Sequence, residues 1–181
     1  MKKVSTTKEK IVEIAQSLMG KEGYSGVSMT DIAKGVGVTK ASLYYFFKNK
    51  ESIYLAVLKE IIREVSDQYT LKPKEKASKQ LLTKKIEQSL QYGIHHGIII
   101  ATPEITDFKK NQKELVELDK EAKVMQDVMQ VFLEKCGVKN PKFGTQILID
   151  ITHAYVWRTL FKTNKNTPKK LAADLANILI R

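Results

Sequence analysis

Seven consecutive residues, Thr39 to Tyr45, bring together side chains that could hydrogen-bond to a nucleic acid. Thr39 and Ser42 supply hydroxyl groups, Lys40 supplies an ammonium group, and two adjacent tyrosines supply phenols. A helix that carries such groups on one face fits a DNA major groove, which is about 12 Å wide. A helix face buried in a protein core is rarely built from lysine, serine and tyrosine. The pattern therefore favours a solvent-facing helix that reads DNA.

A second cation, Lys50, is expected in the first turn of the helix that follows. The helix macrodipole disfavours a cation there by about 0.3–1 kcal/mol. An anion held by the lysine together with free backbone N–H groups would explain the placement, and a DNA phosphate is the natural candidate. The alternative is that Lys50 only points into water.

Residues 28–50 contain the elements that would position these groups. Ser28 and Asp31 have the spacing of a capping box and predict the start of a short helix. Gly37 breaks this helix, and Thr39 is placed to cap another. Two short helices joined by a tight turn form a helix-turn-helix. The apolar residues expected to press the two helices together are Ile32, Ala33, Val38 and Leu43.

The rest of the chain also follows helical periodicity, and no strand pattern of useful length occurs. Asn49 is placed to cap a helix that ends before Pro73. Further helices are predicted over about 6–21, 76–96, 104–135, 142–162 and 168–181. We therefore predict an all-α fold of about nine helices. Residues 1–48 would form a helix-turn-helix DNA-binding domain, and residues 49–181 a helical domain for ligand binding and dimerisation.

Composition limits the function classes. The 181 residues carry 31 basic and 20 acidic side chains, a net charge of +11, which suits a polyanionic partner or a lysine-rich solvated surface. No apolar run, including those at residues 53–58 and 98–101, is long enough for a membrane helix, and one cysteine, Cys136, allows no internal disulfide. A cytoplasmic protein that does not enter membranes is expected.

Motifs typical of enzymes and metal sites are missing. The sequence contains no nucleophile elbow, phosphate loop, Rossmann glycine pattern or zinc-protease motif. His95 and His96 are neighbours, so they point about 100° apart on a helix and would ligate one metal ion only with difficulty. We expect no enzymatic activity, no cofactor and no metal site.

Over residues 8–58 the sequence resembles the TetR family of bacterial transcriptional repressors. The residues that carry the resemblance are Gly23-Tyr24, Ser28, Ile32-Ala33, Gly37-Val38-Thr39, Leu43-Tyr44, Phe47 and Lys50. The resemblance implies a repressor that binds a palindromic operator as a homodimer and is released by a small, partly apolar effector. Beyond residue 60 the similarity is limited to the number and length of the helices.

The resemblance also implies roles for individual residues. Lys40, Ala41 and Ser42 would enter the groove, with Tyr45 on the same exposed face, and Tyr44 would contact the sugar and backbone. Phosphate contacts would come from Ser28, Thr30, Thr39 and Lys50. Two positions depart from the family pattern: Gly35-Val36 replaces a helix former followed by alanine, and Phe46 replaces histidine or tyrosine. The first departure predicts a looser turn, and the second removes one phosphate hydrogen bond.

The C-terminal part has candidate residues for two roles. The dimer surface implied by the resemblance lies on the last two helices, with Ile147, Ile151, Ala154, Leu171, Leu175, Ile178 and Leu179. Candidate effector-binding residues are Tyr92, His96, Phe108, Met125, Met129, Tyr155, Trp157 and Phe161. The alternative for both sets is burial in the monomer core. A helical interaction protein that binds no operator remains a second hypothesis for the whole chain.

Overall fold

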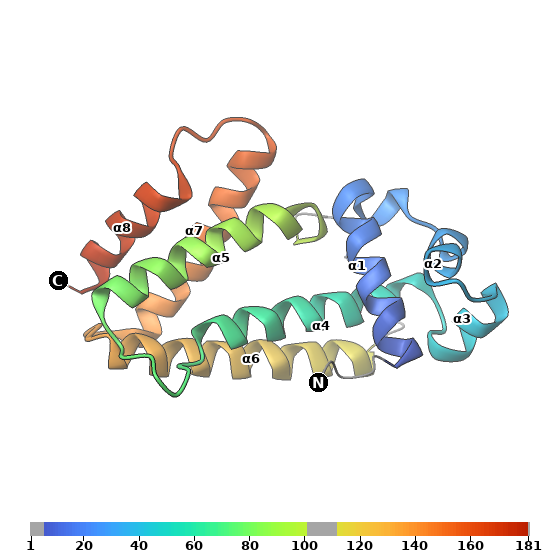
Figure 1. The fold of residues 1–181 in the computed structure, drawn as a ribbon, viewed down its shortest axis with the longest axis horizontal. Helices are drawn as coiled ribbons and strands as arrows, with labels where there is room; N and C mark the ends of the chain where they lie inside the picture. Colours follow the sequence, from blue (N-terminus) through green and yellow to red (C-terminus); the bar gives the residue numbers. More distant parts are fainter. Residues whose placement is uncertain (1–5, 101–111, 181) are drawn as a thin grey trace. The chain divides into compact units, whose positions relative to one another are not determined.

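The computed structural model describes residues 6–100 and 112–180, and all of its regular structure is helical (Figure 1). The helices are α1 (Thr7–Gly26), α2 (Met29–Val36), α3 (Lys40–Phe46), α4 (Lys50–Tyr69), α5 (Lys79–Ile100), α6 (Gln112–Lys135), α7 (Pro141–Leu160) and α8 (Pro168–Leu179). The predicted all-α class is confirmed, with eight helices in the described ranges where about nine were expected. The predicted start of one helix near residue 104 lies outside the described residues.

Local hydrogen bonds begin the helices where the sequence predicted. The Ser28 hydroxyl accepts from the Asp31 amide (3.2 Å), and the Asp31 carboxylate accepts from the Ser28 amide (3.0 Å), which completes the capping box of α2. The Thr39 hydroxyl caps α3 by accepting from the Ser42 amide at 3.1 Å. The side chain of Asn49 accepts from the first turn of α4. These bonds satisfy backbone donors that would otherwise lack partners at a helix start.

By its internal contacts the chain divides into two units. Unit 1 comprises Met1–Ile61 and Ile98–Lys120, and unit 2 comprises Ile62–Gly97 and Glu121–Arg181. Helices α4 and α6 each contribute one part to unit 1 and the rest to unit 2. The predicted functional boundary after residue 48 falls inside unit 1 and stays a prediction.

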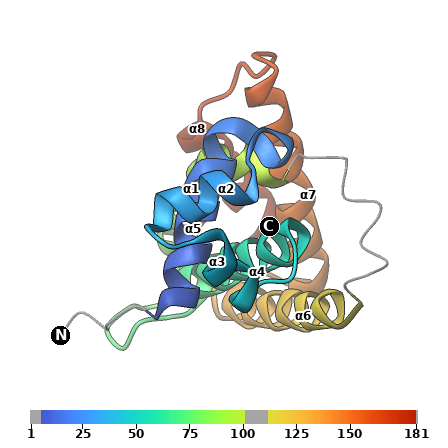
Figure 2. The ribbon, with the colours of Figure 1, turned by 90° about the vertical axis from the view of Figure 1, so that its right-hand side faces the viewer.

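Unit 1 has a core of apolar side chains from α1 to α4. Those without exposed surface include Ile11, Ala15, Met19, Ile32, Leu43, Ile53, Tyr54 and Val57. On α1 they recur every fourth residue, so they form one buried face. Helix α2 packs against both α1 and α3 (Figure 2). Full burial of each large apolar side chain contributes about 1.5–3 kcal/mol, so these contacts between four helices hold the unit together.

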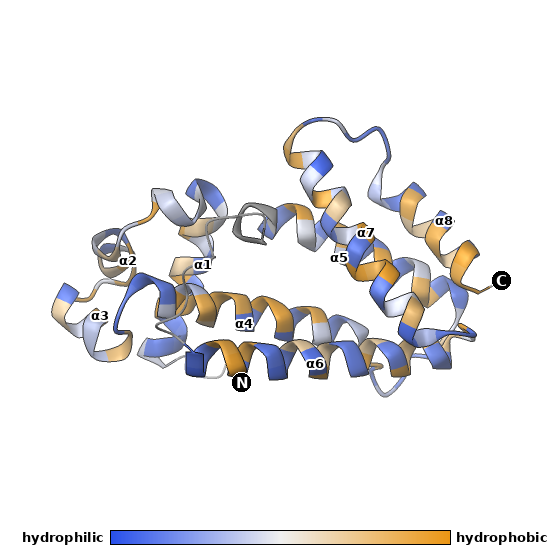
Figure 3. Cartoon of the chain, turned by 180° about the vertical axis from the view of Figure 1, so that it is seen from behind, coloured by the Kyte–Doolittle hydropathy of each residue, from blue (hydrophilic) through white to orange (hydrophobic). Residues whose placement is uncertain are grey.

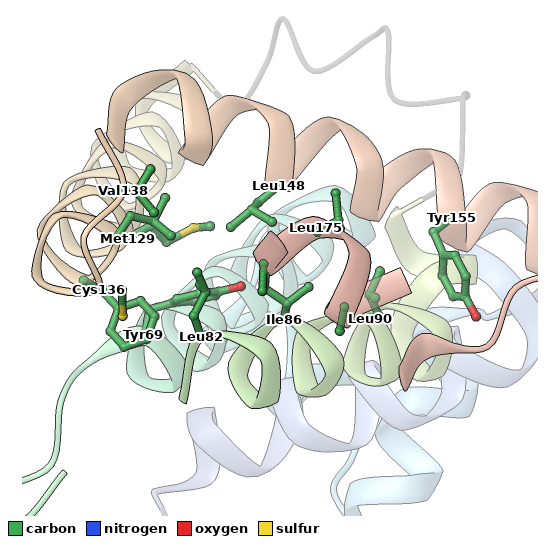
Figure 4. Close-up of a cluster of buried hydrophobic side chains, with 14 residues drawn as sticks. Tyr69, Leu82, Ile86, Leu90, Met129, Cys136, Val138, Leu148, Tyr155 and Leu175 are labelled. Carbon is green, nitrogen blue, oxygen red and sulfur yellow. The ribbon is translucent and has the colours of Figure 1, made fainter. Parts of the chain in front are cut away.

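Unit 2 has its own core, to which α4, α5, α6, α7 and α8 contribute (Figure 4). The ring of Tyr69 packs edge-on against Phe132, with ring centroids 5.5 Å apart. A 3.1 Å hydrogen bond joins the hydroxyls of Tyr69 and Ser89. Burial raises the pKa of Tyr69 to about 12, although the hydrogen bond to Ser89 acts in the opposite direction. The end of α4 is therefore anchored inside the core of unit 2.

Hydropathy along the helices agrees with this burial. In Figure 3 hydrophobic residues alternate with hydrophilic ones along α4, α6 and α8, the pattern of helices that bury one side. One close approach is at Gly93 of α5, where an added Cβ would lie 2.7 Å from a methyl group of Val156 on α7. Glycine is therefore required there for space, because α5 and α7 leave no room for a side chain.

Candidate nucleic-acid interface

The turn between α2 and α3 has the geometry of a helix-turn-helix. Gly37 has a φ of +80°, and its amide donates to the Ala33 carbonyl at 3.0 Å. Nothing lies within 4 Å of a Cβ added at Gly37, so glycine is favoured here by the left-handed backbone and not by lack of space. Ile32, Ala33 and Leu43 are at most 3% exposed, as expected for residues that pack the two helices together. Val38, the fourth predicted contact, is half-buried.

One face of α3 is open to solvent. Lys40, Ala41 and Ser42 are exposed, and Tyr45 is 85% exposed. Tyr44 is 46% exposed, whereas Leu43, between Ser42 and Tyr44 in the sequence, is fully buried. The residues predicted to enter a groove therefore lie together on an accessible surface, and Leu43 anchors the helix from its other side.

The hydroxyls at the starts of α2 and α3 are already engaged. Ser28 donates its hydroxyl to the Asp31 carboxylate at 2.5 Å, and this bond, followed by that from the Ser28 amide, lowers the pKa of Asp31. The Thr39 hydroxyl lies 2.9 Å from the Ser42 hydroxyl. Thr30 is exposed. A phosphate contact from Ser28 would require its proton to leave Asp31, so Ser28 acts here as a cap, and its predicted phosphate role stays a prediction.

Lys50 has a partner within the protein. Its ammonium donates to the backbone carbonyl of Tyr24 at 3.0 Å and lies 4.1 Å from the centre of the Tyr24 ring. The Tyr24 ring in turn packs edge-on against Tyr54 of α4, at 5.0 Å between centroids. Carbonyls near a helix end carry partial negative charge, which offsets the unfavourable place of the lysine in the first turn of α4. Lys50 therefore joins α4 to α1, and its predicted phosphate contact stays a prediction.

The structure explains one of the two departures from the family pattern. A Cβ added at Gly35 of α2 would lie 2.7 Å from the Cγ2 methyl of Ile14 on α1. Gly35 therefore allows α1 and α2 to pack closely, which differs from the looser turn that the sequence suggested. Phe46, the other departure, is half-buried and packs edge-on against Tyr45 at 5.2 Å.

Ion pairs that sequence reasoning missed connect the start of α6 to this region of unit 1. Lys48, in the loop between α3 and α4, lies 3.1 Å from the Glu114 carboxylate, and Lys59 of α4 lies 3.3 Å from Glu117. Burial by itself acts to raise the pKa of Glu114, but hydrogen bonds from its own amide and from Lys48 hold it below the usual value. Within unit 2, Arg63 pairs with Glu121 at 2.9 Å. The i, i+3, i+7 spacing of the three glutamates on α6 was the available signal.

Comparison with known proteins identifies the N-terminal domain. The sequence model for bacterial regulatory proteins of the tetR family matches residues 11–57. Over 47 residues the chain is 51% identical to the biofilm operon icaADBC HTH-type negative transcriptional regulator IcaR of Staphylococcus aureus (strain Newman). Residues 11–57 therefore form an N-terminal domain of the TetR family. The match covers 26% of this chain and about a quarter, 25%, of the length of the curated relative.

Solved structures extend the likeness of this chain to nearly its whole length at the level of the fold. The fatty acid degradation regulator FadR from Bacillus halodurans has a TM-score of 0.72 at 14% identity, over 99% of this chain and 97% of that one. AibR, solved in complex with isovaleryl coenzyme A and operator DNA, has a TM-score of 0.66 at 19% identity, over 97% and 98% of the two chains. At these identities the likeness establishes the fold alone.

The predicted effector-binding residues do not form one group. Met129 and Tyr155 are buried in the core of unit 2, and Met125 packs against that core. Trp157 and Phe161 contact each other on the exposed side of α7 and are 47% and 60% exposed. Phe108 lies outside the described residues. The predicted pocket lining thus divides between core and surface, because Tyr155 and Trp157, only two positions apart on α7, point to different sides of the helix.

Tyr92 and His96 are the two candidates that the structure brings together. Their rings lie 4.3 Å apart on α5, and the Tyr92 hydroxyl donates to the carboxylate of Glu64 on α4. Burial lowers the pKa of His96, the neighbouring His95 adds to this effect, and Glu64 opposes it. A half-buried carboxylate, phenol and imidazole therefore adjoin one another in unit 2.

The predicted dimer residues also differ in exposure. Ala154 of α7 is exposed, and Ile178 of α8 is 63% exposed. Four residues, Ile147, Ile151, Leu171 and Leu179, are half-buried and pack against the core of unit 2. Leu175 is only 4% exposed and belongs to that core, so it has almost no surface left for a partner. Sequence periodicity could not separate the inward side of α8 from its outward side at this position.

Two further properties concern the whole described part of the chain. Over residues 6–100 and 112–180, no helix combines the length and the apolar composition required to cross a membrane. In the same ranges, no cluster of three or more histidine, cysteine, aspartate or glutamate side chains is arranged to hold a metal ion.

Proposed function

We propose that this TetR-family chain is a transcriptional repressor that binds a palindromic operator as a homodimer and leaves it when a small, partly apolar effector binds. The observation that carries the proposal is the exposed polar face of α3, in a domain half identical to that of the negative regulator IcaR. A buried α3 would have removed the proposed reading surface.

In this proposal the exposed residues of α3 divide into base-reading and backbone-binding groups. Lys40 is placed to donate to the O6 and N7 atoms of guanine, and the Ala41 methyl to contact a thymine methyl. Ser42 and Tyr45 share the exposed face, and Tyr44 contacts sugar and phosphate. Contacts to the DNA sugar-phosphate backbone fix the position of the protein on the duplex, whereas contacts to base edges give sequence preference.

A second copy is required because one helix-turn-helix grips a single half-site weakly. Two copies whose reading helices lie about 34–36 Å apart meet successive turns of the major groove. The exposed side of α7 supports such pairing, since Phe143 is 62% exposed and lies on the same helical side as Ala154 and Trp157, and Phe161, directly after the helix, is 60% exposed. Together with Ile178 of α8 these residues form the proposed dimer surface. Leu175 is left out.

Effector binding is assigned to unit 2. AibR, which shares the fold, was solved with isovaleryl coenzyme A and operator DNA, so a protein of this architecture can hold a ligand. In this chain Tyr92 and His96, beside Glu64, are the candidate polar contacts. To turn a 1:99 population of the DNA-free state into 99:1, an effector must prefer that state by about 5.5 kcal/mol.

The test is a mobility-shift titration with the promoter duplex beside the gene that encodes the chain. We expect a dimer–DNA complex whose affinity falls steeply with salt, because several lysine–phosphate contacts release counterions. Lys40→Ala should cost about 1–3 kcal/mol at particular base pairs and relax sequence preference there. Lys21→Ala, an exposed lysine at the far end of α1, serves as the control for loss of one charge.

A chain that binds this duplex no better than unrelated DNA, at every salt concentration, contradicts the proposal and supports the helical interaction protein. Sedimentation of the same preparation reports the oligomeric state. A monomer at the concentration that saturates DNA contradicts the dimer.

A further inference from the structure

Lys48 is an exposed cation directly beside the proposed reading helix. It follows the buried Phe47 in the loop after α3, and its side chain is 53% exposed. The family resemblance assigned no role to this residue. Its ammonium lies 3.1 Å from a carboxylate oxygen of Glu114, whose side chain is 32% exposed.

A docked α3 would bring this ammonium near the DNA backbone. Double-stranded DNA carries one negative charge per about 1.7 Å of its axis, so a cation two residues beyond a helix in the major groove is within the range of phosphates. In the unbound protein, however, the Glu114 carboxylate already neutralises the same ammonium. Carboxylate and phosphate are therefore alternative partners for one lysine.

Glu114 is held in place by the start of α6. It lies in the first turn, where the macrodipole stabilises a carboxylate. The helix continues to Lys135, and its buried residues Met129, Phe132 and Leu133 belong to the core of unit 2. The competing carboxylate is thus carried by a helix whose other end is anchored among the residues of the proposed effector unit.

We propose that Lys48 contacts the DNA backbone and that Glu114 competes with phosphate for its ammonium. The inference rests on the proposed function, because it requires that α3 docks on DNA. Exposed ion pairs are weak, so phosphate can displace the carboxylate, and the competition lowers DNA affinity by about two- to fivefold.

A neighbouring ion pair provides a matched control. Lys59 and Glu117 form the same kind of pair, at 3.3 Å, between α4 and α6. Lys59 lies nine residues beyond Lys50, which is about 14 Å further along the helix and more than the screening length of about 8 Å at physiological salt. Glu117→Gln removes the same charge from α6 without releasing a lysine beside α3.

The experiment measures equilibrium binding of the full-length variants to the promoter duplex and to a mixed-sequence duplex by fluorescence anisotropy. Glu114→Gln should bind both duplexes about two- to fivefold more tightly than the wild type, whereas Glu117→Gln should differ little. Lys48→Gln should reduce the slope of log affinity against log salt by about 0.9, the loss of one phosphate contact. In the Lys48→Gln background, Glu114→Gln should have no further effect.

Equal effects of Glu114→Gln and Glu117→Gln, or a Glu114→Gln effect that persists without Lys48, overturn the inference. An unchanged salt slope in Lys48→Gln also overturns the inference. If circular dichroism shows that Glu114→Gln does not fold, the salt slope of Lys48→Gln is the measurement that tests the inference. These results leave the proposed function intact as long as the wild type prefers the promoter duplex. A wild type without that preference contradicts the proposed function instead.

Discussion

Replacing Gly35 by alanine tests the close packing of α1 against α2 in the helix-turn-helix. An added Cβ would lie 2.7 Å from the Cγ2 methyl of Ile14 and 3.7 Å from Leu18. The first distance is shorter than Cβ contacts found in folded proteins, and the methyl branches directly from the Ile14 Cβ, so it cannot move away alone. Either α1 and α2 separate or Ile14 leaves its rotamer.

Two opposed effects set the magnitude. Alanine is favoured over glycine in a helix interior by about 1 kcal/mol. Overpacking of a well-filled contact costs about 1–3 kcal/mol. We therefore expect Gly35→Ala to lower the free energy of unfolding by up to about 2 kcal/mol, and to weaken promoter binding because α2 supports α3.

Urea unfolding followed by circular dichroism measures the effect, and a double-mutant cycle with Ile14→Ala isolates its cause. Since Ile14→Ala removes the clashing methyl, the loss caused by Gly35→Ala should shrink or reverse in that background, with a coupling of about 1 kcal/mol or more. A Gly35→Ala variant about 1 kcal/mol more stable than the wild type, with additive energies in the cycle, would refute the close approach.

Two further predictions concern unit 2. The pKa of Tyr69 is raised from 10.0 to about 12, so the stability linked to its neutral form is complete below pH 10 and is lost as the pH rises through about 12. The absorbance titration of Tyr69→Phe should therefore lack a phenol step near pH 12. A variant that instead lacks a step near pH 10 would contradict this prediction. The ammonium of Lys85 is buried, 3.5 Å from the Glu75 carboxylate. Glu75→Gln should lower the thermal midpoint by several degrees because it leaves the lysine charge unpaired, whereas Lys85→Met should leave the midpoint nearly unchanged or raise it. Equal midpoints for Glu75→Gln and the wild type would show that the ion pair does not stabilise the fold.

Features that depend on neighbours in the chain could be predicted from the sequence. The caps of α2 and α3, the left-handed Gly37 and the inward side chain of Leu43 involve residues three to ten positions apart, where composition and spacing determine the geometry. The TetR-family resemblance rests on this same segment, and the family model matches residues 11–57. The exposed polar face of α3 follows from it, since burial of Leu43 turns the polar residues outward.

Features that depend on partners far along the chain were decided by the tertiary structure. Lys50 meets the Tyr24 carbonyl across 26 positions, and Lys59 meets Glu117 across 58. A lysine can reach water, a carbonyl, a carboxylate or a phosphate, and its type does not select among them. Likewise an apolar stripe on a helix shows that one side is buried without saying which neighbour covers it, so Leu175 could be placed in the core only after α8 was packed. Local hydrogen bonds form between groups the backbone already holds together, whereas long-range partners are brought together only by packing.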